Sequence, residues 1–193
     1  MTDPMPSPFS KQLKEATRET HDALDQTIMR SEPFASRAHY GRFLRMQYLF
    51  HRDIAPLFAH AGLRARVADL TERQRLEALR QDMRDLDIPV PEDTAAVIDA
   101  DMPLPAALGW FYVAEGSNLG AAILFKQAAR LGLGANFGAR HLAAHPDGRA
   151  PHWRAFTQVL DSEPLDEAAR AEATEAARTA FRRVHAHAAH CFA

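Results

Sequence analysis

Apolar side chains recur along most of this chain at steps of three and four residues, the spacing of a helix with one buried face. No stretch of four or more residues alternates cleanly between apolar and polar, as a half-buried strand would. The first predicted helix covers residues 10–29, and the second is a long helix capped by Ser36 and ended by Gly62. The third opens at the capping-box pair Thr71 and Gln74 and runs through Leu86. A short helical stretch at 94–98 follows, then a helix over residues 105–131, a helix opened by Pro151 and a last helix after Pro164. This pattern predicts an all-α fold.

Length and composition predict one globular domain. The chain has 193 residues, of which 47% are hydrophobic and 25% are charged, close to the average for folded proteins. We treat residues 1–193 as a single domain, with a flexible N-terminus expected at residues 1–9. The single cysteine, Cys191, excludes an intrachain disulfide and a cysteine-based zinc cluster.

Charge and hydropathy give no reason to expect nucleic acid or a membrane as a partner. The formal net charge is −2, which provides no basic surface for either. Residues 1–8 lack the basic and then apolar pattern of a secretory signal. The most apolar run, residues 104–114, stops at Glu115 and is too short to cross a bilayer. We therefore expect a cytoplasmic protein.

Two glycines stand in the middle of the most apolar predicted helix, at Gly116 and Gly120. Each costs about 1 kcal/mol relative to alanine inside a helix, so their presence needs a reason. One reason is close packing of a neighbouring helix against bare backbone; the other is close approach of a flat ligand. The glycines alone leave both open.

A histidine on the first predicted helix is a candidate metal ligand. Lys14, Thr17 and His21 fall in one narrow stripe, with Lys14 about 10 Å from His21 along the axis. Asp25, one turn after His21, can accept a hydrogen bond from one imidazole nitrogen and leave the other free for a metal. The alternative is a partly buried histidine satisfied by a backbone or carboxylate partner.

Other histidines give weaker indications. His141 and His145 have the spacing of metal ligands, but no carboxylate or third ligand lies nearby in sequence, and catalytic zinc needs three protein ligands. Near the C-terminus, His185, His187, His190 and Cys191 are expected on an exposed helix face, with adventitious metal binding as the alternative. The chain has no phosphate-loop, dinucleotide or nucleophile-elbow motif.

Three segments resemble the bacterial, biliverdin-producing heme oxygenases. Residues 109–126, GWFYVAEGSNLGAAILFK, resemble the distal helix of that family, and residues 16–22, ATRETHD, resemble its proximal helix. Residues 138–149, GARHLAAHPDGR, followed by HWRAF at 152–156, are similar to the branch with which Gram-negative bacteria recover iron from heme. The resemblance covers essentially the whole chain and implies a single-domain helical fold with heme between the two helices.

The resemblance implies a role for each matching position. His21 matches the proximal ligand of the heme iron, and Gly116 and Gly120 match the glycines that let the distal helix lie over the macrocycle. The remaining candidate heme-site residues are Lys14 and Tyr112 at the propionates, Ser117 and Asn118 on the distal side, Gln47 and His51 ordering water above the iron, and Thr17 and Asp25 on the proximal helix.

The implied reaction is the oxidative cleavage of heme to biliverdin, CO and ferrous iron. It consumes O2 and electrons from an external donor, a ferredoxin or a flavin-type reductase, and proceeds by attack of an iron-bound hydroperoxide on a meso carbon. Heme is then both cofactor and substrate. Because Lys14 and Tyr112 both offer donors to the propionates, we expect the α-meso carbon as the main target. The alternatives are a heme carrier without activity and a heme-free protein on the related thiaminase-like fold.

Overall fold

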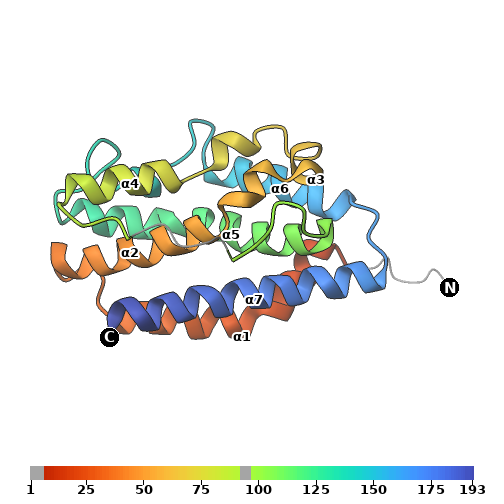
Figure 1. Ribbon diagram of the computed structural model, residues 1–193, viewed down its shortest axis with the longest axis horizontal. Helices are drawn as coiled ribbons and strands as arrows, with labels where there is room; N and C mark the ends of the chain where they lie inside the picture. The colour runs from red at the N-terminus through yellow and green to blue at the C-terminus, as the bar shows by residue number, and fades with distance from the viewer. Residues whose placement is uncertain (1–6, 92–96) are drawn as a thin grey trace.

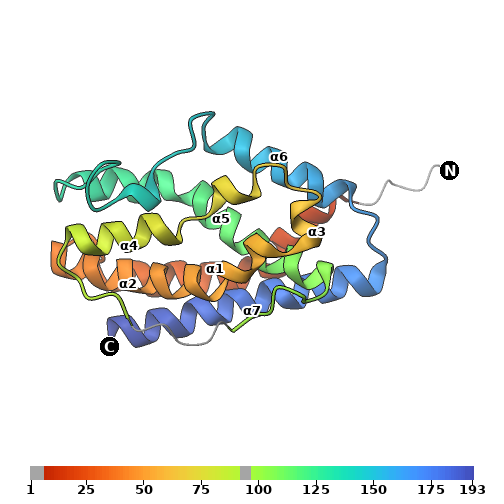
Figure 2. The same ribbon diagram turned by 45° about the horizontal axis from the view of Figure 1, so that its top comes forward.

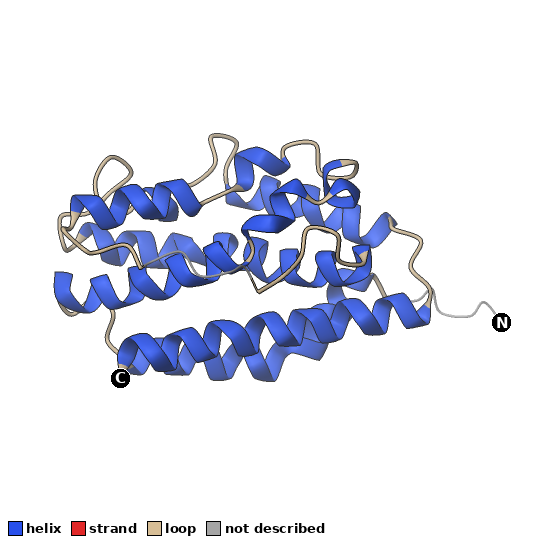
Figure 3. Cartoon of the chain, in the orientation of Figure 1, coloured by secondary structure: helices blue, strands red, loops and turns tan. Residues whose placement is uncertain are grey.

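The computed structural model describes residues 7–91 and 97–193, and within them the all-α prediction is confirmed. No strand occurs among these residues (Figure 3). The helices are α1 (Phe9–Arg30), α2 (Arg37–Asp53), α3 (Ala61–Arg64), α4 (Leu76–Asp85), α5 (Leu104–Ala129), α6 (Arg149–Ser162) and α7 (Glu167–Phe192), with 3-10 turns at Ala55–Ala59, Leu70–Arg73 and Arg140–Leu142 (Figure 1).

The second helix is shorter than predicted. It ends at Asp53 and is followed by the 3-10 turn Ala55–Ala59 and by α3. Pro56 lies at the start of that turn. Since proline has no N–H to donate and its ring clashes with the carbonyl four residues earlier, it ends the helix even though the apolar spacing continues.

The capping box predicted at Thr71 and Gln74 does not form. Thr71 lies in the 3-10 turn Leu70–Arg73, and α4 begins only at Leu76, without a side-chain cap. The reason is tertiary: the Arg73 side chain is buried and forms ion pairs with Asp69 and Glu115. The short helix predicted at 94–98 falls mostly on residues 92–96, which lie outside the described residues.

The long helix α7 packs along α1, α2 and α5 and closes the core (Figures 1 and 2). Its many alanines allow close approach, and the tightest contact is with Gly109 of α5. A Cβ atom at Gly109 would lie 2.1 Å from the backbone oxygen of Ala173 and 2.9 Å from the Cβ atom of Ala176. This glycine is therefore required by packing.

The ends of the chain differ in two respects from expectation. Phe9 begins α1 and is buried, so the flexible segment expected at residues 1–9 does not extend to it. His187 does not lie on an exposed face: it is buried, and its Nε2 lies 2.7 Å from Asp53, which also pairs with Arg183 at 2.6 Å. A buried carboxylate needs such partners. No helix in the described part of the chain is long and apolar enough to cross a bilayer.

Candidate functional site

The proximal and distal helices of the predicted site meet at one pair of side chains. The hydroxyls of Thr17 on α1 and Tyr112 on α5 share a hydrogen bond. Both helices run in the same direction along the molecule (Figure 1). One turn beyond this contact lie His21 on α1 and Gly116 on α5, so the structure brings the predicted ligand and the first predicted glycine to the same level of the two helices.

His21 has the exposure and the partners of an available ligand. Its side chain is 55% exposed, and its Nδ1 lies 3.5 Å from a carboxylate oxygen of Asp25 and 3.7 Å from one of Asp22. The ring of Phe181 on α7 meets its ring edge-on, with centroids 5.8 Å apart. No described residue bonds Nε2 of His21, so this nitrogen is open to a ligand.

Neither glycine of the distal stretch is needed for packing. A Cβ atom added at Gly116 or at Gly120 would meet nothing within 4 Å, in contrast to one at Gly109. Ile123, on the same side of α5 by helical spacing, is 68% exposed. The packing alternative is therefore wrong for Gly116 and Gly120. Together with Ile123 they form an apolar strip on α5 that faces open space.

The two predicted propionate-binding residues lie near one end of this strip. Tyr112 is buried, its ring packs beside that of Trp153, and burial raises the pKa of its hydroxyl above the usual value. Lys14 is exposed on α1, three residues before Thr17. The hydroxyl of Thr17 also donates to the carbonyl oxygen of Leu13 at 2.7 Å.

On α2, His51 is buried and Gln47 lies half-buried one turn before it. Burial, with smaller contributions from His141 and Arg75, lowers the pKa of His51 to about 3. The imidazole is therefore neutral at physiological pH, and its Nδ1 has no hydrogen-bond partner among the described residues.

His141 and Arg75 lie close enough to His51 to affect its pKa; nothing in the sequence indicated Arg75, and His141 was indicated only as a possible zinc ligand. His141 and Arg75 interact electrostatically with His51 and with each other. Arg75 also interacts with Glu115, the residue before Gly116. The carboxylate of Asp82 holds Nδ1 of His141 at 2.9 Å, while Nε2 of His141 and Nε of Arg75 are buried without a partner in the described structure. These side chains come from distant segments, so no local spacing could indicate them.

The histidine pair considered for zinc is separated. His141 bonds Asp82, whereas His145 stacks on His152 with ring centroids 4.3 Å apart and an interplanar angle of 11°. His152 in turn lies 2.6 Å from Asp69. Parallel stacked rings do not direct their nitrogens at a common ion, and the described residues contain no group of three ligands arranged for a metal.

The side chains of Ser117 and Asn118 form hydrogen bonds within α5. The Ser117 hydroxyl donates to the backbone oxygen of Ala114 at 2.7 Å, and the Asn118 amide donates to Glu115 at 3.3 Å. Two residues correspond to about 200° around a helix, so Asn118 is on the opposite side of α5 from both glycines. This corrects the expectation that Asn118 lines the distal side with them.

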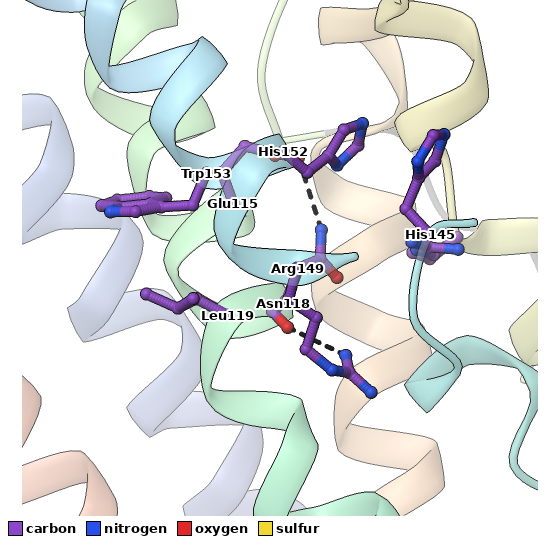
Figure 4. Close-up of a pocket in the computed structure, with 8 residues that line it drawn as sticks. Glu115, Asn118, Leu119, His145, Arg149, His152 and Trp153 are labelled. Carbon is purple, nitrogen blue, oxygen red and sulfur yellow. Dashed lines mark hydrogen bonds between the residues drawn. The ribbon is translucent and has the colours of Figure 1, made fainter. Parts of the chain in front are cut away.

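Behind α5, Glu115 is buried against Arg73. Burial raises the pKa of Glu115, and the charge of Arg73 opposes that rise. A cavity of about 10 Å³ lies on this side of the helix (Figure 4). Its lining residues are Arg75, Glu115, Asn118, Leu119, His145, Arg149, His152 and Trp153.

Comparison with known proteins finds heme oxygenases. The family model described as heme oxygenase matches residues 7–188. The chain is 45% identical over 174 residues to heme oxygenase PigA of Pseudomonas aeruginosa, covering 90% of this chain and 88% of that protein. It is 34% identical over 118 residues to a heme oxygenase of Xanthomonas campestris, covering 58% of this chain and 66% of that protein.

Solved structures give the same result. The heme oxygenase of Neisseria meningitidis superimposes with a TM-score of 0.89 at 39% identity, covering 97% of this chain and 93% of that one. The structure of heme oxygenase-1 from Synechocystis in complex with heme gives a TM-score of 0.74 at 17% identity, covering 95% of this chain and 91% of that one, a likeness of fold.

Proposed function

The chain belongs to the heme oxygenase family and degrades heme, and from this premise we propose that the heme lies between α1 and α5 with His21 as its iron ligand. The observation that carries this proposal is the pairing of two open features at the same level of the two helices. Nε2 of His21 is free of protein partners, and Gly116 and Gly120 have only open space before them.

The chemistry of the residues present fits heme. Exposed apolar groups such as Ile123 suit contact with a porphyrin face. The buried unpartnered nitrogens of His51, His141 and Arg75 need hydrogen-bond partners that the protein does not provide, and ordered water is the usual one. When bound, heme supplies both the redox-active iron and the ring that is cleaved.

On the proximal side, Asp25 orients His21. The carboxylate lies 3.5 Å from Nδ1, close enough to hold that proton after a small rotation or through one water. With Nδ1 protonated, Nε2 carries the lone pair that a metal needs. Phe181 limits rotation of the ring from the other side.

On the distal side, the protein contributes space and water rather than an acid. Glycine backbone lets α5 approach the ring closely, and no titratable side chain stands between Gly116 and Gly120 on that side of the helix. His51 is neutral, and its Nδ1 has no partner among the described residues, so we assign it a water molecule. We assign Gln47 and His51, with His141 and Arg75, to holding the water that delivers protons during O2 reduction.

At the propionate end, Lys14 provides an ammonium and Tyr112 a phenol. The raised pKa of Tyr112 keeps its hydroxyl protonated, so it remains a donor to a carboxylate. Thr17 orients that hydroxyl in the heme-free protein. Two donors at one edge favour one in-plane seating of the heme, and we propose biliverdin IXα as the main product.

Electrons must come from outside the chain, because the reaction consumes them and the sequence holds no dinucleotide-binding motif. We propose a ferredoxin or a flavin-type reductase as the donor.

The deciding experiment gives heme-loaded protein a reductant and O2 and identifies the pigment by chromatography. Loss of the Soret band with formation of biliverdin IXα supports the full proposal. A Soret band that survives reduction and oxygenation indicates a heme carrier, and another isomer contradicts the propionate assignment alone.

A further inference from the structure

One arginine on the far side of α5 joins two parts of the distal wall. Arg149 is the first residue of α6, directly after Gly148, whose φ of +90° turns the chain into the helix. Its Nη1 donates to the carbonyl oxygen of Asn118 at 3.0 Å (Figure 4). Its Nη2 donates to the carbonyl oxygen of Leu142.

Each of the two carbonyl groups belongs to a residue next to a part of the proposed heme site. Asn118 is midway between Gly116 and Gly120, on the opposite side of α5, so a donor there holds the glycine stretch from behind. Leu142 directly follows His141, whose Nε2 is buried without a partner in the described structure. The guanidinium therefore ties the glycine stretch to the segment that carries His141.

The chemistry of arginine suits this task. A hydrogen bond from a charged donor is roughly twice as strong as a neutral one. The planar fork holds two acceptors at a fixed spacing, which the single ammonium of a lysine cannot do. Arg149 is half-buried, and burial together with the charge of Arg75 lowers its pKa, but the guanidinium stays charged at physiological pH.

We propose that Arg149 is a positioning residue for heme oxygenation, which sets the spacing between the glycine face of α5 and the nitrogens of His141. This inference rests on the proposed heme site. A change in that spacing alters how closely α5 approaches the ring and how well the distal water is held, and both affect which meso carbon reacts.

The test compares Arg149→Gln and Arg149→Lys with the matched control Arg154→Gln. Arg154 lies on the same helix, is exposed, and its guanidinium has no described partner. Three quantities are measured: amide hydrogen exchange of residues 116–123 in heme-free protein, the midpoint pH of the alkaline spectral transition of the ferric heme complex, and the distribution of biliverdin isomers.

We expect exchange at residues 116–123 to rise about tenfold or more in Arg149→Gln, with exchange in α2 unchanged. The midpoint pH should shift and the isomers should become mixed, with Arg149→Lys falling between the wild type and Arg149→Gln. Arg154→Gln should match the wild type in all three measurements.

Unchanged exchange and an unchanged midpoint pH in Arg149→Gln would overturn the inference, as would equal changes in Arg154→Gln. A uniform rise in exchange across α2 and α5 would also overturn it, because that result indicates a general loss of stability. If the wild type itself forms no bile pigment, the proposed function fails instead.

Discussion

Replacing Gly116 by alanine should stabilise the heme-free protein and weaken heme binding. Alanine is more favourable than glycine inside a helix by about 1 kcal/mol, and the added Cβ atom meets nothing within 4 Å. In a chain of 193 residues, a gain of about 1 kcal/mol raises the midpoint of thermal unfolding by about 2–4 °C. The same reasoning holds for Gly120.

With heme bound, the sign reverses. The methyl group then points at the space that we assign to the ring, and overfilling a packed contact costs about 1–3 kcal/mol. That cost corresponds to a loss of about 5-fold to 150-fold in heme affinity. Leucine at Gly120 should have a larger effect and should abolish most biliverdin formation.

Gly109→Ala is the matched control on the same helix. Its Cβ atom would lie 2.1 Å from the backbone oxygen of Ala173, so the heme-free protein should lose about 1–3 kcal/mol of stability. Thermal unfolding by circular dichroism, with and without hemin, measures both effects. If Gly116→Ala destabilises the heme-free protein as Gly109→Ala does, or leaves the affinity for heme unchanged, the glycines do not face the ligand.

Three further predictions test other parts of the site. His21→Ala should leave the heme-free protein as stable as the wild type, because the side chain is 55% exposed, but the heme complex should lose the axial-imidazole spectrum and most turnover. Added imidazole should restore activity, and an unchanged spectrum would reject His21 as the ligand. Lys14→Asn combined with Tyr112→Phe should turn one main biliverdin isomer into a mixture, whereas an unchanged ratio would exclude these residues as the propionate clamp. For His51, the folded pKa of about 3 lies below the ordinary value of about 6.5, so the unfolded state binds the proton more readily and the free energy of unfolding falls as pH drops from 6.5 toward 3, by at most about 1.4 kcal/mol per pH unit. His51→Gln should flatten that pH dependence when heme-free protein is unfolded in urea, and an equally steep dependence would contradict the buried neutral imidazole.

The sequence predicted the helices well where local spacing decides them and failed where a tertiary contact decides. The boundaries of α1 and α5 agree with the predictions to within two residues, because α1 has a periodic apolar face and α5 is an apolar run bounded by Pro105 and Gly132. At Thr71 a good capping sequence lost to the buried ion pairs of Arg73 with Asp69 and Glu115. Glu115 lies 42 residues from Arg73, and no local pattern contains it.

The candidate site divides in the same way. A stripe on one helix made His21 a candidate ligand and two glycines raised the question of a close approach, and the family resemblance then assigned both to heme. Three glycines of α5 look alike in sequence, yet only the neighbours in space distinguish Gly109, which packs on α7, from Gly116 and Gly120, which do not. For the same reason Arg75 was not recognised and His141 was considered only for zinc, since the residue that both affect, His51, lies far from them in sequence.

The heme-free fold carries several unfavourable features on α5 and on the segments that hold His51, His141 and Arg75. Each glycine inside α5 costs about 1 kcal/mol, each buried nitrogen without a partner costs about 1–3 kcal/mol, and Ile123 leaves most of its apolar surface in water. A helix selected for stability alone would carry alanine at Gly116 and Gly120, where nothing opposes a side chain. Breaches of local rules without an evident structural reason are typical of a functional site. A flat apolar ligand on this face of α5 relieves two of them, because it covers Ile123 and fills the space before the glycines.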